Sequence, residues 1–102
     1  MKLFLLTPNA PAASSLRYYE GAVVAAPTPE DARRVHPATS ESNKIAWDVQ
    51  EGFWRSHWGD GTTRRYINTT WPANVEEIDA VEIGLAKADV QPGLLLARHC
   101  IN

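Results

Sequence analysis

The sequence belongs to a short chain with nearly balanced charge. It has 102 residues, of which 44% are hydrophobic and 22% charged, with seven prolines, six glycines and a formal net charge of −2. This size fits one small domain, so we expect a single domain over residues 1–102 and exclude two. The balance of 10 basic and 12 acidic residues argues against a whole-protein electrostatic grip on nucleic acid and against an acidic DNA mimic.

The single cysteine, Cys100, cannot form an internal disulfide, so the fold must depend on its core, as suits a reducing cytoplasm. The apolar run Leu3–Leu6 is far shorter than a signal-peptide core or the roughly 20 residues that span a bilayer. We therefore expect a soluble cytoplasmic protein.

The N-terminal part predicts two strands. Lys2–Thr7 is apolar and ends at a proline, and Leu16–Ala26 carries two tyrosines and a valine pair, so the two segments should pair as a hairpin. Asn9–Ser15 is turn-prone and would connect them.

A short helix should follow, with Thr28 as its N-cap, Pro29 at the first helical position and acidic residues in the first turn. His36-Pro37 should end it. We expect one helix face to turn toward the sheet and the other toward water, with these residues: Ala32 and Val35 on the sheet side, Arg33 and Arg34 on the water side.

After a polar loop over Ala38–Asn43, the stretch from Lys44 to Trp71 holds six of the nine aromatic residues. Gly59-Asp60-Gly61 is a strong turn signal between Phe53–Trp58 and Thr62–Asn68, which predicts a β-hairpin. A phosphate-binding loop is disfavoured here because no lysine and no helix follow.

Near the C-terminus, alternating Val81, Ile83 and Leu85 predict a strand, Pro92-Gly93 a turn, and Leu94–His99 a last strand. The chain should therefore be an α+β domain: a small, mostly antiparallel β-sheet of five or six strands with one short helix. The expected order is strand, strand, helix, hairpin, strand, strand.

Several of these segments resemble a group of small accessory proteins encoded by tailed phages and prophages. The similar segments are Val23–Ala26, Glu30–Pro37, Trp71-Pro72, Val81–Ala86 and Pro92–Ala97. The resemblance covers roughly half the chain and implies a phage accessory protein acting in the host cell; many such proteins inhibit host defences. The group commonly ends in a different tail from Arg98–Asn102, and the tryptophan-rich middle stands apart from it. The group supplies no catalytic motif.

Candidate reaction chemistry is sparse. His36, His57 and His99 are 21 and 42 positions apart, without neighbouring ligands, so we expect no metal and no cofactor. We expect His36 to interact, partly cationic, with the C-terminus of the short helix. In a strand, His99 and Cys100 would point to opposite faces, which disfavours a nucleophilic thiol.

The middle hairpin is the candidate binding surface. Alternation places Trp54, Ser56 and Trp58 on one face and Phe53, Arg55 and His57 on the other, while Trp47 and Trp71 are natural core residues. The expected partner-binding residues combine arginines with aromatic rings, as interface hot spots do: Trp54, Arg55, His57, Trp58, Arg64, Arg65 and Tyr66. The competing interpretation is that the rings are core and the arginines merely solvated.

The resulting hypothesis is a binding protein that inhibits a host defence component, such as a CRISPR effector. The alternative is a protein that sequesters a nucleotide-type signal on the same arginines and rings. An enzyme is disfavoured because no acid–base or nucleophile pair is recognisable. A carboxylate-rich stretch, which we expect to be solvated, is a second potential interface through phosphate mimicry: Glu76, Glu77, Asp79, Glu82 and Asp89.

Overall fold

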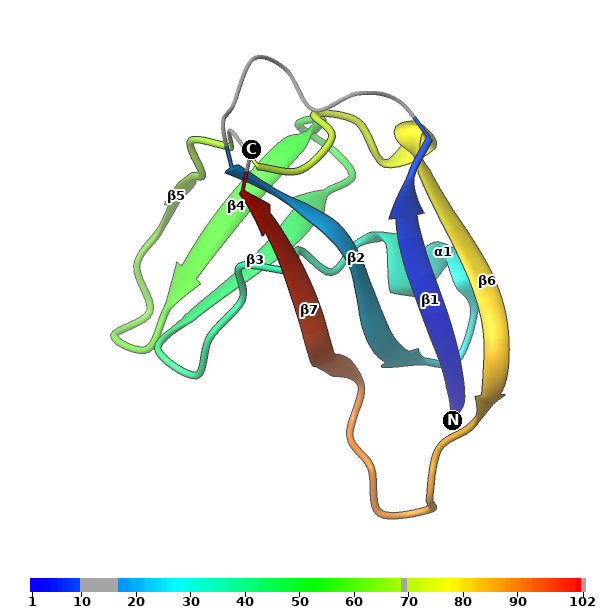
Figure 1. Cartoon of the computed structure of the whole chain (residues 1–102). Coiled ribbons are helices and arrows are strands. Elements are labelled where there is room, and N and C mark those ends of the chain that lie inside the picture. Colours follow the sequence, from blue (N-terminus) through cyan, green and yellow to red (C-terminus); the bar gives the residue numbers. More distant parts are fainter. Residues whose placement is uncertain (10–16, 69, 102) are drawn as a thin grey trace.

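The computed structural model describes residues 1–9, 17–68 and 70–101. This part of the chain forms mostly antiparallel strands with one short helix, which confirms the α+β prediction (Figure 1). The elements, in chain order, are β1 (Lys2–Pro8), β2 (Arg17–Ala26), α1 (Pro29–Arg33), β3 (Asn43–Asp48), β4 (Phe53–Trp58), β5 (Thr63–Arg65), the 3-10 helix η1 (Val75–Glu77), β6 (Ile78–Leu85) and β7 (Gly93–Ile101).

The strands form two sheets. The first has four strands in the order β6-β1-β2-β7, and the second has three in the order β3-β4-β5. The first sheet is built around the expected β1–β2 hairpin, in which Leu5 lies opposite Val23. The last two strands do not pair with each other; they flank this hairpin on its two sides. The first sheet is therefore complete only when the C-terminal strands β6 and β7 have paired with the hairpin.

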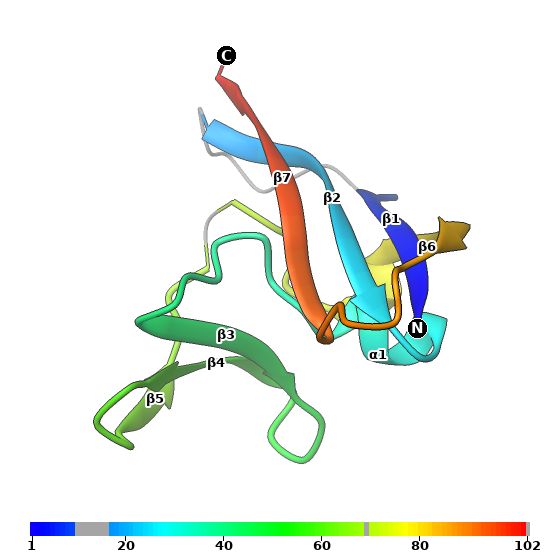
Figure 2. The same ribbon diagram turned by 90° about the horizontal axis from the view of Figure 1, so that it is seen from below.

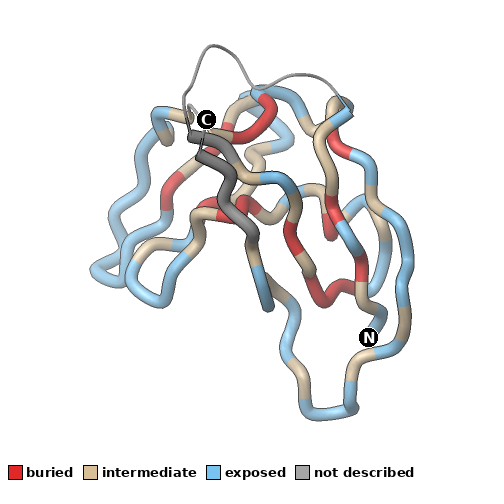
Figure 3. The backbone as a smooth tube through the Cα atoms, in the orientation of Figure 1, coloured by how far each residue is buried: buried red, intermediate tan, exposed pale blue. Residues whose placement is uncertain are grey.

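The two sheets share one core. Figure 2 shows α1 and the three-stranded sheet on the same side of the four-stranded sheet. The inner faces of β1, β2 and β6 meet Ala32 of α1, Ile45 of β3 and Trp54 of β4 in one buried cluster. Figure 3 shows buried positions on strands of both sheets, whereas the turns at the edge of the molecule are exposed. The opposite face of the four-stranded sheet carries neither a helix nor a second sheet among the described residues.

The helix begins as expected but ends at Arg33, before His36-Pro37, and Val35 lies beyond it in a β-bridge with Ala46. The Thr28 hydroxyl accepts a hydrogen bond from the Asp31 N–H at 3.2 Å, which confirms the N-cap. Ala32 is buried and Arg34 is exposed, as predicted. Arg33 does not simply face water, because its Nε donates to the Ile78 carbonyl at 3.0 Å. The helix lies beside β6, so this side chain links the two elements.

Strand β3 was not expected, and with it the described residues form seven strands rather than five or six. Its residues are short of β-branched side chains, so its strand character comes from pairing with β4, where Trp47 lies opposite Trp54. Its other edge is occupied by the segment after α1: Trp47 N–H donates to the Arg34 carbonyl at 3.0 Å. The expected turn over Asn9–Ser15 lies almost wholly outside the described residues.

The alternating apolar residues of β6 do form a strand, but they do not enter the core. Val81, Ile83 and Leu85 are all exposed, whereas Ile78 is buried. A register shift opposite Leu3 and Phe4 leaves Ile83 without a cross-strand partner. Such a bulge changes which side chains face inward along the strand.

His36 is fully buried between the sheets, contrary to the expectation of a partly cationic ring at the helix end. Its Nδ1 accepts from the Ala38 N–H at 3.0 Å, so the proton of the neutral ring lies on Nε2, 2.9 Å from the Asn68 Oδ1. The rings of Trp54 and Tyr66 approach it edge-on, each at a centroid distance of 5.0 Å. Burial lowers the pKa of His36 from 6.5 to about 4.

The N-cap can be tested by Thr28→Ala, which leaves one N–H of the first helical turn without its side-chain acceptor. We expect the free energy of unfolding to fall by roughly 0.5–2 kcal/mol. Urea unfolding followed by circular dichroism measures this change. An unaltered midpoint would contradict a stabilising role for the cap.

The buried His36 predicts a specific loss of stability in mild acid. The unfolded chain protonates this histidine near pH 6.5, whereas the folded chain resists until about pH 4. Stability should therefore be complete above pH 6.5 and decline by roughly 3 kcal/mol as the pH falls to about 4. Denaturant unfolding at half-unit pH steps measures the slope.

The effect of His36 on stability can be separated from that of the acidic residues, because the two act in different pH ranges. Asp48 and Asp60 have lowered pKa values, so their stabilising contributions disappear only below their ordinary value of 3.8. His57→Gln is the matched control, because His57 is exposed; this variant should keep the slope. A constant stability between pH 6.5 and 4.5 would contradict the buried neutral ring.

Candidate functional site

Strand β4 separates the predicted site residues between its two faces. Trp54 and Ser56 point inward and are 2% and 3% exposed. The Trp54 indole donates to the Pro72 carbonyl at 2.9 Å and packs against the Trp47 ring. The prediction that Trp54 contacts a partner is therefore wrong: the core lies on this side of β4, and the indole fills it. Trp71 is also buried, as predicted.

On the outer face of β4, two arginines lie against one aromatic ring. The guanidinium carbons of Arg55 and Arg65 are 4.7 Å and 5.2 Å from the centre of the Phe53 ring. Arg55 and Arg65 are direct cross-strand partners on β4 and β5. Two like charges in this position repel each other, and the negative face of the Phe53 ring attracts both.

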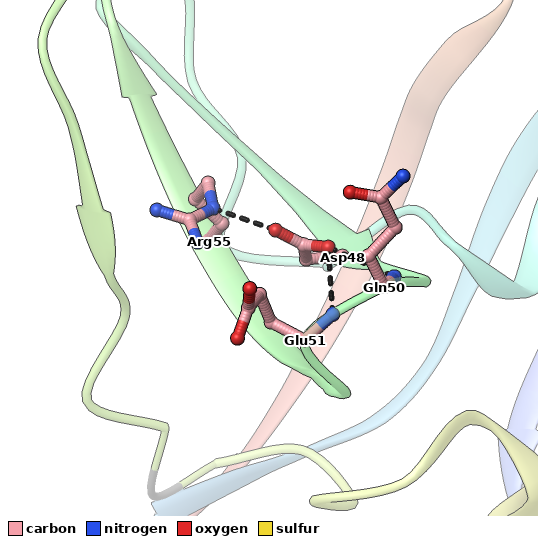
Figure 4. Close-up of polar contacts among 4 residues, drawn as sticks. All are labelled: Asp48, Gln50, Glu51 and Arg55. Carbon is pink, nitrogen blue, oxygen red and sulfur yellow. Dashed lines mark hydrogen bonds and ion pairs between the residues drawn. The ribbon is translucent and has the colours of Figure 1, made fainter.

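Asp48 neutralises only one of these arginines. Its Oδ2 accepts from the Arg55 Nε at 2.8 Å, as Figure 4 shows. Its Oδ1 accepts from the backbone N–H groups of Gln50 and Glu51, both at 3.0 Å. The Glu51 N–H contributes most to lowering the Asp48 pKa, followed by the Arg55 hydrogen bond. The carboxylate is thus held in place by the turn that follows β3.

The register of β3 adds a further cation to this surface. Lys44 lies opposite His57, and both side chains are exposed. We call the outward surface of the three-stranded sheet the basic face; it comprises Lys44, Asp48, Phe53, Arg55, His57 and Arg65. The ion pairs of the described residues include Arg55 but neither Lys44 nor Arg65. Lys44 and Arg65 therefore add to the basic face two cations that form no ion pair with the described carboxylates.

Lys44 and Phe53 were absent from the predicted site. Phe53 could have been predicted from the sequence, since it alternates with Arg55 and His57 along one strand and so shares their face. Lys44 could not be placed, because its position depends on β3, which the sequence did not predict. Of the seven predicted residues, only Arg55, His57 and Arg65 lie together on the basic face.

Trp58 and Arg64 lie on the other side of the hairpin, near its tip. Trp58 is 40% exposed because β4 extends there beyond the buried cluster. Both residues line a shallow depression of about 390 Å³, together with Asp60 and Thr62. Asp60 accepts from the Thr62 hydroxyl at 2.7 Å and backbone N–H at 3.0 Å, which lowers its pKa and fixes the expected turn. Gly61 has the positive φ of 89° that this turn requires.

Tyr66 is half-buried and serves mainly to close the core. Its ring packs against His36, and its backbone N–H donates to the Trp54 carbonyl at 2.8 Å. Burial raises its pKa above the usual value. In its predicted role as a partner-binding residue, Tyr66 could therefore use only the exposed part of its ring.

The acidic stretch is spread over three elements. Glu82 on β6 forms an ion pair with Lys2 at 3.1 Å, and Asp79 accepts from the Asn9 side chain at 3.0 Å. Glu76 and Glu77 belong to η1, and Asp89 lies in the loop after β6. A regular row of free carboxylates is thus not formed.

Among the described residues, no group of three His, Cys, Asp or Glu side chains is placed to hold a metal ion. The side chains of His99 and Cys100 lie outside those that the structure describes. No helix within the described ranges is long and apolar enough to cross a membrane.

Comparison of this chain with protein-family models, with curated proteins and with solved structures finds no match. Function is therefore inferred from the surface of the molecule.

The different environments of Trp54 and Trp58 can be tested directly. Trp54→Ala should lower the free energy of unfolding by roughly 3–5 kcal/mol, because it leaves a cavity and removes the indole hydrogen bond to the Pro72 carbonyl. Trp58→Ala, at the exposed tip, should cost far less. Denaturant unfolding of both variants measures the contrast, and equal losses would contradict the assignment of the two rings.

Proposed function

We propose that this protein is a non-enzymatic binding protein whose basic face recognises an acidic surface on a protein partner and blocks it. The resemblance to phage accessory proteins makes a host defence component, encountered in the host cytoplasm, the partner class to test first. The observation that carries the proposal is the Arg65 guanidinium, which lies against Phe53 and pairs with no described carboxylate, whereas Asp48 binds Arg55.

This arrangement suits protein recognition for three reasons. A guanidinium that rests on a ring has already lost part of its conformational freedom, so less entropy is lost when it binds a carboxylate. Arginine and aromatic side chains supply most hot-spot energy in interfaces. The side chains also project from paired strands, which hold them on one broad surface rather than around a deep cavity.

The alternative, sequestration of a nucleotide, is favoured by a different place on the hairpin. The depression at the tip combines the exposed Trp58 ring with Arg64, a pairing that can stack a base and hold a phosphate. Asp60 lies in the same depression and would repel the phosphate. We therefore rank this function second.

Two adjacent arginines separate the two functions. Arg65 belongs to the basic face and Arg64 to the tip depression, because neighbouring residues of a strand point to opposite sides. We expect Arg65→Glu to weaken partner binding more than tenfold, or about 1.4 kcal/mol, and Arg64→Glu to leave it nearly unchanged. Both are exposed, so the melting temperature should hardly change.

The measurement compares proteins retained from a bacterial host lysate by immobilised wild type, Arg65→Glu and Arg64→Glu, quantified by mass spectrometry. Lys87→Glu is the charge-matched control, since Lys87 is exposed in the loop after β6, away from the three-stranded sheet. Retention of the same proteins by Arg65→Glu would contradict the proposal. A thermal shift with nucleotides that Arg64→Glu abolishes would support the alternative instead.

A further inference from the structure

The outward face of the four-stranded sheet, opposite α1, is apolar across its whole width. In the register, Val81 of β6, Leu5 of β1, Val23 of β2 and Leu96 of β7 form one continuous cross-strand row. Val81 and Leu96, at the two ends of the row, are 55% and 65% exposed. We call this surface the apolar face. Burying such a row would release water from four strands at once.

The apolar face is not flat. A hollow of about 240 Å³ lies beside the row, lined by Leu5, Thr7, Gly21, Val23 and Leu96, with Glu20 as its charged lining residue. Gly21 creates part of this space, because a Cβ there would meet the Leu6 carbonyl oxygen at 3.0 Å. The exposed Leu96 lies at the edge of the hollow. The same surface therefore carries an apolar side chain that protrudes and a recess lined mainly by apolar residues.

The neighbouring charges limit what can cover the apolar face. Glu20 lines the hollow, and Asp79, which accepts a hydrogen bond from the Asn9 side chain, lies opposite Thr7 on the next outward row. The cross-strand row itself holds only apolar residues, so it offers no cation to attract an anionic lipid surface or a nucleic acid. The cations of the basic face belong to the other sheet. A largely neutral, apolar protein surface fits better.

The size of the face agrees with a modest dimer. Four strands at about 4.8 Å spacing and eight residues of β6 at about 3.3 Å each give a projected area of roughly 500 Å². Two copies together would bury roughly 1,000 Å², near the lower limit for specific interfaces. A patch of this size also reaches the upper range seen on monomeric proteins.

We propose that the apolar face is a homodimer interface, in which two copies pack these sheet faces together about a twofold axis. The protruding Leu96 of each copy would enter the hollow of the other, which is the self-complementarity that an isologous interface requires. Packing of sheet against sheet with interdigitating side chains is a common β-sandwich geometry. This inference does not depend on the proposed function of the basic face.

Analytical ultracentrifugation of the whole chain over a concentration range tests the proposal. We expect wild type to shift from monomer to dimer between roughly 1 μM and 100 μM, as a micromolar Kd gives. Val81→Lys should raise the dimer Kd at least tenfold, because a lysine at the row would be buried against apolar side chains. Leu96→Lys tests the same interface from the opposite edge strand.

Val49→Lys is the matched control. The exposed fraction of Val49, 62%, is similar to that of Val81, but Val49 lies in the turn between β3 and β4. This variant should dimerise like wild type, and melting curves should show all three variants folded. A wild type that stays monomeric at 100 μM overturns the proposal, as does a dimer that both Val81→Lys and Leu96→Lys leave intact.

Discussion

The buried imidazole of His36 is the contact on which the rest of the structure depends. His36 follows α1. Its backbone N–H donates to the Ile45 carbonyl of β3, and its ring forms a hydrogen bond with the Asn68 side chain. The Asn68 amide in turn donates to the carbonyls of Trp71 and Pro72, so one neutral ring ties the helix, the second sheet and the returning chain together. A charged ring could not occupy this place without a large desolvation cost.

This contact also decides which side of the hairpin is available for binding. The edge-on packing of Trp54 and Tyr66 against His36 commits one face of β4 to the core. Alternation then forces Phe53 and Arg55 outward, and pairing with β5 brings Arg65 beside them. The basic face is therefore a geometric consequence of how the second sheet is anchored, and Asp48 reduces the repulsion that this clustering creates.

The sequence predicted the parts of the fold that local chemistry determines. The Thr28 cap, the β1–β2 pairing and the Gly59–Gly61 turn depend on neighbouring residues, and all three are confirmed. Strand β3 depends on β4 and on the chain after α1, which no local pattern reveals. For the site, alternation identified two faces of β4 but not the buried one, so Trp54 was misassigned while Arg55 and His57 were placed together correctly.

Two sheets that pack through their inner faces leave two outer faces, and this chain gives them opposite character. The outer face of the β3-β4-β5 sheet carries Lys44 and Arg65, whereas that of the β6-β1-β2-β7 sheet carries Leu5, Val81 and Leu96. Because the two faces share no strand, a change on one need not alter the other. Dimerisation through the apolar face would present two basic faces on one particle. A partner with repeated acidic sites would then bind with higher avidity than the contacts of one face provide, if the spacing of its sites allows both to engage.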